Sequence, residues 1–471
     1  MTFARGAGAV VPVELSWRER LALWVYGAAM RLARPLLLRK LKRRAESEPG
    51  YAHDVPARFG CYGAKETDAH APTGNGLADA PRVWVHAVSL GEARTAAILL
   101  AALREQVPGM RLLLTHTTAT GWAEGSRHLV AGDLQTWLPW DDADAVTRFL
   151  HHFRPDIGVL METEVWPVLV RTCAGQGVPL VLANARLNQR SWRQACRLRW
   201  LSRPAYAGLA AVWAQSAADV QRLTDLGAPV GGAWGNLKFD AHPDPGQCLQ
   251  ARQWRQAQPR PVVMLASSRA GEELEFVKQI SALTLYGKGL SATFSDESPV
   301  QWLIVPRHPQ RFDEVADLIR AQGWDCWRRS EWGDCLSQGR GTVSEQGKPV
   351  IWLGDSLGEM ALYYSLADVA LLGGSFEPLG GQNLIEAAAC GCPVVLGPHT
   401  FNFAEVSDQA VMAGAARRVV DLGQGVQAAL HCVSDPDARQ AAVQAALGFA
   451  HAHRGAAART AQAITQLLTA R

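Results

Sequence analysis

The chain has 471 residues, of which 48% are apolar and 19% charged, and its formal net charge is +3. This composition is typical of a soluble globular protein of two or three domains, and it excludes a disordered chain, a collagen-like repeat and a polytopic membrane protein. Residues 1–58 carry eleven basic and five acidic side chains, a balance of +6, whereas the remaining residues balance at −3. A basic end on a mildly acidic body argues against a nucleic-acid-binding protein and indicates that this end meets an anionic surface.

Residues 1–50 are predicted to associate with a membrane. The apolar stretch Leu21–Met30 has no small-residue cleavage site at its end, which argues against a secretory signal peptide. It is about half as long as the ~20 residues that cross a bilayer. The basic run RKLKRR (39–44) follows it, and such clusters attract anionic lipid headgroups at the cytoplasmic face. We expect an interfacial helix or a short re-entrant anchor; the alternative is a helix packed on its own soluble domain.

The cysteine pattern excludes two further classes. Nine cysteines are scattered between Cys61 and Cys432, and none forms a CxxC pair. Zinc sites and disulfide frameworks need denser and more regular spacing. We therefore expect buried free thiols in a reducing cytosol and no structural metal.

Residues 51–239 alternate between strand-like and helix-like segments. Four nearly continuous apolar runs are predicted as strands, at Val83–Val88, Leu112–Thr117, Ile157–Met161 and Leu180–Ala183. Helical periodicity lies between them, at Glu92–Gln106, Asp142–Phe153 and Trp166–Gly175. Strands this apolar are buried on both faces, as in a parallel sheet covered by helices. The pattern predicts a Rossmann-like domain.

A second series of the same kind occupies residues 260–434. Its strands are predicted at Val262–Ala266, Trp302–Val305, Val350–Leu353, Val369–Leu372 and Val394–Leu396. Residues 240–259 are polar, contain three prolines and are predicted as a linker, while 435–471 are predicted as closing helices. Lys65–Pro81 and Gly287–Ser298 are predicted as surface loops. The fold class is therefore α/β, with two doubly wound domains facing each other across a cleft and ligands bound at the carboxyl ends of the strands.

The first candidate site follows the strand that ends near Val88, in the sequence HAVSLGEAR (86–94). Ser89 and Gly91 form a turn, and Glu92 opens the next helix, where backbone N–H groups and the helix dipole stabilise an ionised carboxylate. We expect Glu92 to stay charged and to point into the cleft, ready to accept a proton. The alternative is a plain helix cap.

A second acidic motif follows another buried strand, in METEVWP (161–167). Packing does not explain Glu162 and Glu164 so close together, and Pro167 suits the first turn of a helix. We expect these carboxylates beside Glu92; the alternative is that one is solvated and the other caps a helix. Arg186, in NARL (184–187), adds a guanidinium to the same region.

Loops of the second domain carry residues suited to a nucleotide. Arg307 follows a strand in PRHP (306–309), where its guanidinium and helix N–H groups bind phosphate together. GDSLGE (354–359) follows another strand, and glycine pairs at 373–374 and 380–381 let a ligand approach the backbone or serve only as turns. Glu386 suits ribose hydroxyls. The chain has no G-x-x-x-x-G-K-S/T motif, which excludes a P-loop enzyme.

Taken in their order along the chain, the motifs resemble those of the 3-deoxy-D-manno-octulosonic acid (Kdo) transferases of lipopolysaccharide synthesis. They are HAVSLGE, LLTHTTATG, METEVWP, LANARL, PRHP, GDSLGE, GGSF, GGQNLIEAAACGCPV and GPHTFNF, and the resemblance covers roughly residues 17–425. The resemblance implies a GT-B fold and transfer of Kdo, with inversion, from CMP-Kdo to the lipid A precursor, lipid IVA. CMP-Kdo is then a substrate, and neither a cofactor nor a metal is expected.

The resemblance also implies residue roles. Glu92 matches the general base, for which we expect support from Glu162 and Glu164, with Ser89, Gly91 and Arg186 on the acceptor side. The CMP-contacting segments match Pro306, Arg307, Leu357, Gly358, Glu359, Asn383, Leu384, Ile385 and Glu386. The N-terminal segment would hold the protein on anionic lipids at the cytoplasmic face of the inner membrane. Gln382 replaces the family's usual His, and an amide cannot carry charge.

Two other functions remain open from the residues alone. A GT-B transferase or epimerase that uses a UDP-sugar would share the architecture and the nucleotide loops. A non-catalytic membrane scaffold would explain the basic end but not two carboxylate motifs beside a nucleotide site. The number of Kdo residues transferred depends on the shape of the cleft around the acceptor.

Overall fold

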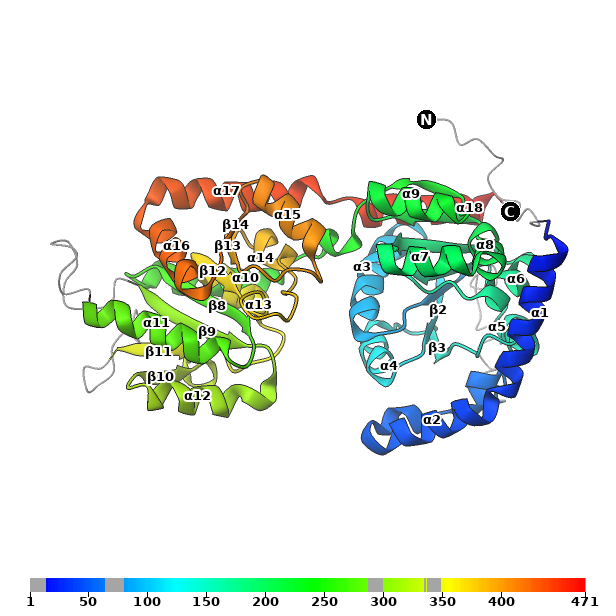
Figure 1. Cartoon of the computed structure of the whole chain (residues 1–471), viewed down its shortest axis with the longest axis horizontal. Coiled ribbons are helices and arrows are strands. Elements are labelled where there is room, and N and C mark those ends of the chain that lie inside the picture. Colours follow the sequence, from blue (N-terminus) through cyan, green and yellow to red (C-terminus); the bar gives the residue numbers. More distant parts are fainter. Residues whose placement is uncertain (1–13, 64–79, 287–299, 334–335, 337–348, 471) are drawn as a thin grey trace. The chain divides into compact units, whose positions relative to one another are not determined.

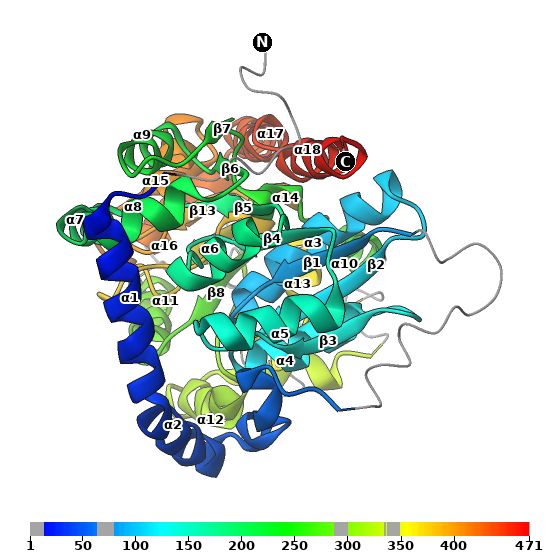
Figure 2. The same ribbon diagram turned by 90° about the vertical axis from the view of Figure 1, so that its right-hand side faces the viewer.

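The computed structural model describes residues 14–63, 80–286, 300–333, 336 and 349–470. They form two compact units, Met1–Asp240 with Arg454–Arg471 and Ala241–His453. Each unit is built on a seven-stranded parallel sheet with helices on both faces (Figures 1 and 2). This confirms the predicted α/β class with two doubly wound, Rossmann-like domains.

The sheet of the first unit has the strand order β3-β2-β1-β4-β5-β6-β7. Its strands are β1 (Arg82–His86), β2 (Arg111–His116), β3 (Leu134–Trp137), β4 (Ile157–Met161), β5 (Leu180–Ala185), β6 (Ala211–Ala214) and β7 (Val230–Ala233). The central strands are fully buried, as their continuous apolar sequences predict. The order of successive strands reverses between β1 and β4, and ligands of such sheets bind at this switch point.

Helices cover both faces of this sheet. They are α3 (Leu90–Gln106), α4 (Ala119–Gly125), α5 (Ala143–Phe153), α6 (Pro167–Gly175), α7 (Gln189–Arg197), α8 (Arg199–Ala207), α9 (Ala217–Asp225) and α18 (Ala456–Thr469). Apolar residues of α3 and α18 pack in one core, and those of α5 and α6 pack in the other. Short 3₁₀ helices complete the unit at η1 (Pro49–Ala52), η2 (Val55–Phe59), η4 (Ser126–His128) and η5 (Leu237–Asp240).

The N-terminal segment forms two helices, α1 (Trp17–Leu32) and α2 (Arg34–Ser47). A capping box starts α1, because the Ser16 and Glu19 side chains each accept a backbone N–H of the other residue. The two helices meet at an angle of 51°, and Pro35 lies in the first turn of α2. Within the described residues neither helix alone is long and apolar enough to cross a membrane, although the bent pair together has the length and composition to do so.

The sheet of the second unit has the order β10-β11-β9-β8-β12-β13-β14. Its strands are β8 (Val262–Ser268), β9 (Gln301–Pro306), β10 (Asp325–Arg328), β11 (Val350–Leu353), β12 (Val369–Leu372), β13 (Val394–Leu396) and β14 (Ala416–Arg418). The helices are α10 (Pro245–Ala257), α11 (Glu272–Tyr286), α12 (Phe312–Ala321), α13 (Met360–Leu366), α14 (Ile385–Ala389), α15 (Ala404–Met412), α16 (Leu422–Ser434) and α17 (Pro436–Ala452), with 3₁₀ turns η7 (Pro309–Arg311) and η8 (Arg329–Glu331).

Two domain predictions differ from this structure. Residues 240–259, predicted as a linker, contain α10, which packs on α13 because Ala251 and Trp254 are buried there. Of the predicted closing helices, α17 belongs to the second unit, but α18 returns to the first unit and packs on α3. The Asp240 carboxylate accepts the N–H groups of Gly455 and Ala457, which fixes the start of α18. The predicted surface loops lie outside the described residues, apart from Ala80 and Pro81.

Candidate active site

The predicted charged residues of the first unit follow three neighbouring strands. Glu92 lies in the first turn of α3 after β1, Glu162 directly follows β4, and Arg186 follows β5. Because β1, β4 and β5 are adjacent and parallel, their carboxyl ends bring these side chains to one edge of the sheet. The electrostatic influence of Glu164, Glu162 and Arg186 on Glu92 agrees with this grouping.

The Glu92 carboxylate is held by its own helix start. Ser89 caps α3, its hydroxyl accepting the Glu92 N–H at 3.3 Å, and the Glu92 carboxylate accepts the Val88 N–H at 2.7 Å. Burial, together with the charges of Glu164 and Glu162, raises the pKa of Glu92 to about 7, although the Val88 N–H and Arg186 lower it. The prediction that Glu92 stays charged therefore holds for only part of the molecules at neutral pH. Desolvation and like charge outweigh the helix start, and Glu92 titrates near neutral pH.

Glu162 is the most buried carboxylate of this group, with 5% of its surface exposed. Arg186 Nε lies 3.3 Å from one of its oxygens and Lys238 Nζ lies 3.4 Å from the other. Its backbone has φ +56°, which costs a non-glycine residue energy, and it is fixed by hydrogen bonds with Ala183 and Arg186. Glu162 is therefore an internal anion that positions two cations at this edge of the sheet.

Lys238 is the residue of this group that the sequence analysis missed. It lies in η5, which follows β7 at the far end of the sheet order. Asn184 brings η5 back toward β5, because its side-chain oxygen accepts the Leu237 N–H at 3.0 Å. The sequence signal that could have identified Lys238 is its position shortly after a strand. Because β7 is glycine-rich, this strand was not predicted, and Lys238 was therefore not recognised.

Glu164 is partly buried beside the same cluster. Burial raises its pKa, although the Trp166 indole N–H donates to it at 2.9 Å. Gly91 is exposed, whereas Ser89 is engaged in the helix cap. Three carboxylates and two cations thus lie near one helix start, where one carboxyl has a pKa suited to taking up a proton at neutral pH.

In the second unit, arginines gather after β8 and β9. Burial lowers the pKa of His308, and so do the nearby charges of Arg269, Arg307 and Arg311. Arg307 is exposed, and its N–H donates to the Ser268 carbonyl at 3.0 Å, which joins the two loops. Arg311 is bound to Glu273 and Glu314. Arg307 and Arg269 therefore remain to attract an anion, and Arg269 was not predicted.

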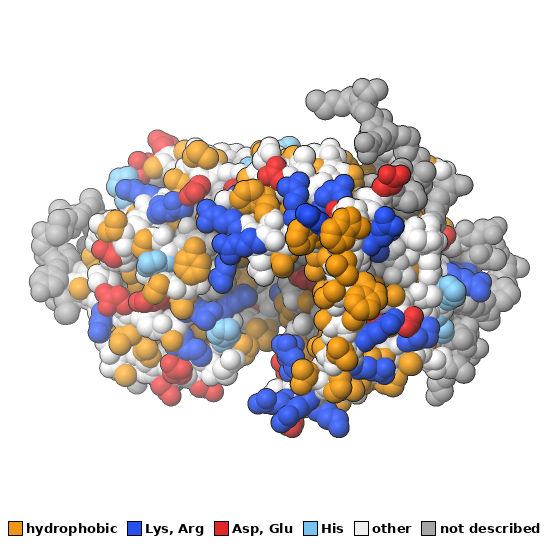
Figure 3. All heavy atoms as spheres, turned by 45° about the vertical axis from the view of Figure 1, so that its right-hand side comes forward, with side chains coloured by type: hydrophobic (Ala, Val, Ile, Leu, Met, Phe, Trp, Pro, Cys, Tyr) orange, Lys and Arg blue, Asp and Glu red, His pale blue; other side chains and the backbone are white. Residues whose placement is uncertain are grey.

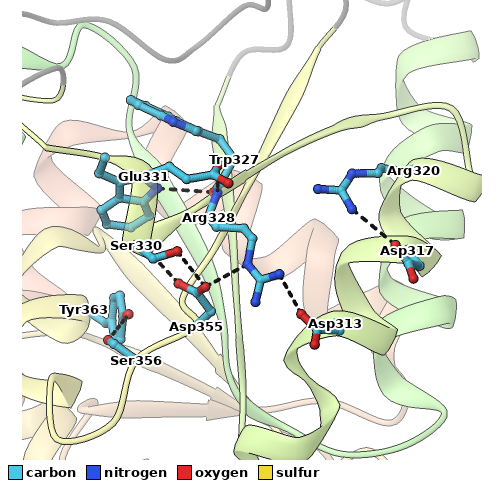
Figure 4. Close-up of polar contacts among 11 residues, drawn as sticks. Asp313, Asp317, Arg320, Trp327, Arg328, Ser330, Glu331, Asp355, Ser356 and Tyr363 are labelled. Atoms are coloured by element: carbon cyan, nitrogen blue, oxygen red, sulfur yellow. Dashed lines mark hydrogen bonds and ion pairs between the residues drawn. The ribbon is translucent and has the colours of Figure 1, made fainter.

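The loop that contains Leu357, Gly358 and Glu359 is fixed by charged residues of β10 and η8. Arg328 lies between Asp355 at 2.7 Å and Asp313 at 2.6 Å, and Ser330 also donates to Asp355 (Figure 4). Arg329 pairs with Glu359 at 2.9 Å. The Leu357 side chain is exposed, and Gly358 has φ +80°, a conformation that favours glycine.

The first glycine pair, Gly373-Gly374, is not an open backbone site. The N–H of Gly374 donates to both oxygens of Glu272, at 2.7 and 2.8 Å, and Phe376 N–H reaches the same carboxylate. Burial raises the pKa of Glu272 although these N–H groups stabilise its anion. Of the two alternatives for this pair, the structure therefore favours a turn at Gly374, and the sequence analysis missed Glu272.

The segment Asn383–Glu386 forms the start of a short helix. Asn383 accepts the Ile385 N–H at 3.1 Å, and α14 begins at Ile385 rather than at Asn383. Leu384 and Ile385 have buried side chains, so only their backbone groups are available to a ligand. Asn383 and Glu386 are partly exposed, and the amide of Gln382 lies beside Gly374. Within the described residues, no group of three or more His, Cys, Asp or Glu side chains is placed to hold a metal ion.

The fold of this chain is similar to that of solved structures. A glycosyltransferase from Rickettsia africae is 13% identical and has a TM-score of 0.51, over 83% of this chain and 99% of that chain. Two parallel-sheet, Rossmann-like units of this kind define the GT-B class of fold.

The family follows from sequence. Residues 53–241 match the family model of 3-deoxy-D-manno-octulosonic-acid transferase (kdotransferase). The Kdo transferase of Bordetella pertussis is 44% identical over 94% of this chain and 99% of its own length. That of Haemophilus influenzae is 30% identical over 90% of each. The chain belongs to the Kdo transferase family, glycosyltransferases of lipopolysaccharide biosynthesis, as its motifs predicted.

Proposed function

We propose that this protein transfers Kdo from CMP-Kdo to the lipid A precursor, lipid IVA, with inversion at the anomeric carbon. Family membership supports Kdo transfer, and the observation that carries the mechanism is the pKa of about 7 at Glu92. A carboxylate of this pKa is an efficient general base at neutral pH, because a substantial fraction is ionised and its basicity exceeds that of an ordinary Glu.

The proposed reaction is a single displacement. Glu92 takes the proton from a sugar hydroxyl of the acceptor while that oxygen attacks the anomeric carbon of Kdo. The bond between this carbon and the phosphate oxygen breaks, and CMP leaves with the bonding electron pair. When Glu92 gains the proton, its repulsion from Glu162 and Glu164 ends, which favours the transfer.

The charge on departing CMP would be met by residues of the second unit. Arg307 and Arg269 supply positive charge after β9 and β8. The proposed contacts with the nucleotide come from Pro306 and from backbone groups around Gly358, Leu384 and Ile385. Two polar side chains, Asn383 and Glu386, are also proposed to contact the nucleotide. Fixed cations are able to stabilise a phosphate leaving group directly, so we expect transfer to persist in the presence of EDTA.

We further propose that the protein acts at the cytoplasmic face of the inner membrane. Its acceptor is an acylated, phosphorylated glycolipid, and the basic run of α2 suits an anionic membrane surface. The charge balance of +6 in residues 1–58 supports this location.

Mass spectrometry of detergent-dispersed lipid IVA after incubation with CMP-Kdo tests donor, acceptor and number of transfers together. We expect one or more Kdo mass increments. Absence of any increment, with folded protein and fresh CMP-Kdo, would contradict the proposal. In a thermal-shift titration CMP should raise Tm and UDP should not, because only a bound nucleotide stabilises the folded state. Stabilisation by UDP alone would instead favour a UDP-sugar enzyme.

A further inference from the structure

Helix α1 exposes large apolar side chains on one face and buries an acidic side chain on the opposite face. Trp17, Leu21, Trp24 and Val25 are 51–71% exposed, whereas Glu19 is buried. At 100° per residue, positions 17, 21, 24 and 25 share the face opposite position 19. A helix on an ordinary water-exposed surface shows the reverse arrangement. Figure 3 shows the result as a band of apolar side chains over α1, flanked by Lys and Arg.

The inner face of α1 is bound to the first unit by polar contacts along its whole length. Glu19 pairs with Arg203 of α8 at 2.6 Å, near the start of the helix. In the middle of α1, the Tyr26 hydroxyl donates a hydrogen bond to the buried carboxylate of Asp141. Arg31 pairs with Asp142 at 2.8 Å near its end. Removing α1 from this position would leave Asp141 buried without its tyrosine partner, so α1 stays on the unit.

The corner between α7 and α8 has the same surface chemistry as α1. Residues 165–218 contain seven arginines and no acidic residue. Arg193, Arg197 and Arg199 are exposed at this corner, and the apolar Leu198 and Trp200 beside them are 55% and 57% exposed. Interfacial tryptophan surrounded by arginine is the composition that binds anionic membrane surfaces.

The corner and α1 form one continuous surface. The Arg18 guanidinium lies 5.4 Å from the Trp17 ring of its own helix and 5.5 Å from the Trp200 ring of α8. One turn further along α8, Arg203 holds Glu19 beneath this layer. Trp17, Arg18 and Trp200 therefore join the exposed apolar residues of both elements into a single patch with a basic rim.

We propose that Trp17, Leu21, Trp24, Val25, Leu198 and Trp200 form a bilayer face that binds an anionic phospholipid surface, with α1 lying in the plane of the membrane interface. The α7–α8 corner is thus a second membrane contact, far in sequence from the N-terminus. The in-plane orientation follows because the polar contacts of α1 with the first unit extend from Glu19 to Arg31. The inference deepens the proposed membrane location, on which it rests.

Charge reversal at the corner tests the proposal. Cosedimentation of the full chain with vesicles of phosphatidylcholine and 30% phosphatidylglycerol measures binding. In the variant R193E/R197E/R199E, we expect the partition coefficient to fall by roughly tenfold or more, because each charge near an anionic surface contributes about 1 kcal/mol. Trp200→Ser should weaken binding by a smaller factor. Binding of both variants at wild-type strength would overturn the proposal.

A matched variant controls for net charge. R252E/K278E/R417E reverses three exposed cations of the second unit, and its vesicle binding should stay within about twofold of wild type. An equal loss in both triple variants would show that total charge, not the bilayer face, governs binding. Circular dichroism and Tm confirm that each variant folds, and Trp200→Ser keeps the test valid if the triple corner variant does not.

Assays of Kdo transfer distinguish a failure of the bilayer-face proposal from a failure of the proposed function. With lipid IVA dispersed in detergent, the corner variants should transfer Kdo at wild-type rate, but with lipid IVA in vesicles their rate should fall with binding. If wild-type protein transfers no Kdo in detergent, the proposed function fails, whatever the vesicle result. Transfer from vesicles at full rate by the corner variants would overturn the bilayer face alone.

Discussion

Lys238 places its ammonium 3.4 Å from the buried carboxylate of Glu162, a residue 76 positions earlier in the chain. Arg186 approaches the other carboxylate oxygen at 3.3 Å. The two cations balance a carboxylate that has little access to water, and they come from the ends of different strands. This ion cluster links the sheet of the first unit to the proposed catalytic Glu92, which lies within the electrostatic range of Glu162.

Replacing Lys238 should destabilise the first unit. Lys238→Met removes one of two cations from a buried anion, and we expect the free energy of unfolding to fall by about 1–3 kcal/mol. Urea unfolding followed by circular dichroism measures this loss. Lys278→Met, at an exposed position of α11, is the control and should change stability by less than about 0.5 kcal/mol. Equal stabilities of the two variants would contradict the role of Lys238.

Glu92→Gln should abolish transfer and leave nucleotide binding intact. The amide keeps the size of the side chain but cannot accept the acceptor's proton, so we expect the rate to fall by about 10²–10⁴-fold. CMP-induced thermal shift should equal that of wild type. Glu105→Gln, an exposed position on the same helix, should transfer normally. Near-normal transfer by Glu92→Gln would refute the assignment of the base.

Transfer should rise with pH through the pKa of Glu92 near 7, because only the ionised carboxylate accepts a proton. Arg186 lowers this pKa, so Arg186→Gln should move the rise in rate to higher pH. A pH–rate profile of kcat/KM measures the shift. An unchanged midpoint in Arg186→Gln would show that another group controls the profile.

The same pKa predicts how stability depends on pH. The folded protein holds the Glu92 proton more tightly than the unfolded chain, whose pKa is about 4.5, so this carboxyl destabilises the fold as pH rises from about 4.5 through about 7. Glu92→Gln should therefore raise Tm more at pH 8 than at pH 5. Scanning calorimetry at both pH values checks this, with Glu105→Gln expected to show no such difference.

Glu272 should be essential to the turn at Gly373-Gly374. Glu272→Ala leaves the N–H groups of Gly374 and Phe376 without an acceptor, and we expect a loss of about 2–3 kcal/mol together with a higher KM for CMP-Kdo. Glu275→Ala, exposed one turn along the same helix, is the control. Urea unfolding and donor titration measure the two effects, and wild-type values for Glu272→Ala would contradict them.

The Arg328–Asp355 pair should stabilise the GDSLGE loop in a pH-dependent way. Burial raises the pKa of Asp355, but hydrogen bonds from Arg328 and Ser330 outweigh it and hold the pKa below 3.8. The pair therefore contributes at pH above about 3.8, and its contribution is lost as pH falls through the lowered pKa. Arg328→Met should cost about 1–3 kcal/mol at pH 7 and less at pH 3. Urea unfolding at both pH values tests this, and an equal cost at both would exclude the ion pair as its cause.

The sequence predicted most central strands but missed β6 and the strands at the edges of both sheets. β4, β11, β12 and β13 have their predicted bounds because continuous apolar sequence marks a strand covered on both faces. β7 and β10 are only partly buried, so their sequences carry no such signal. The linker prediction failed for a related reason, because α10 buries only two side chains, Ala251 and Trp254, and most of its other residues are polar.

The sequence alone determined the class of fold, the strand ends that carry chemistry and the family, because strand periodicity and contiguous motifs are local properties of a chain. Glu92, Glu162 and Arg186 were identified in this way. Only the tertiary structure decided the pKa of Glu92, the pairing of Glu162 with Lys238 and the hydrogen bonds that Glu272 accepts from the glycine turn. These properties depend on burial and on charges that are distant in sequence. The tertiary structure likewise brings Trp200 beside Trp17, so that the basic end of the chain and a distant arginine-rich corner share one surface.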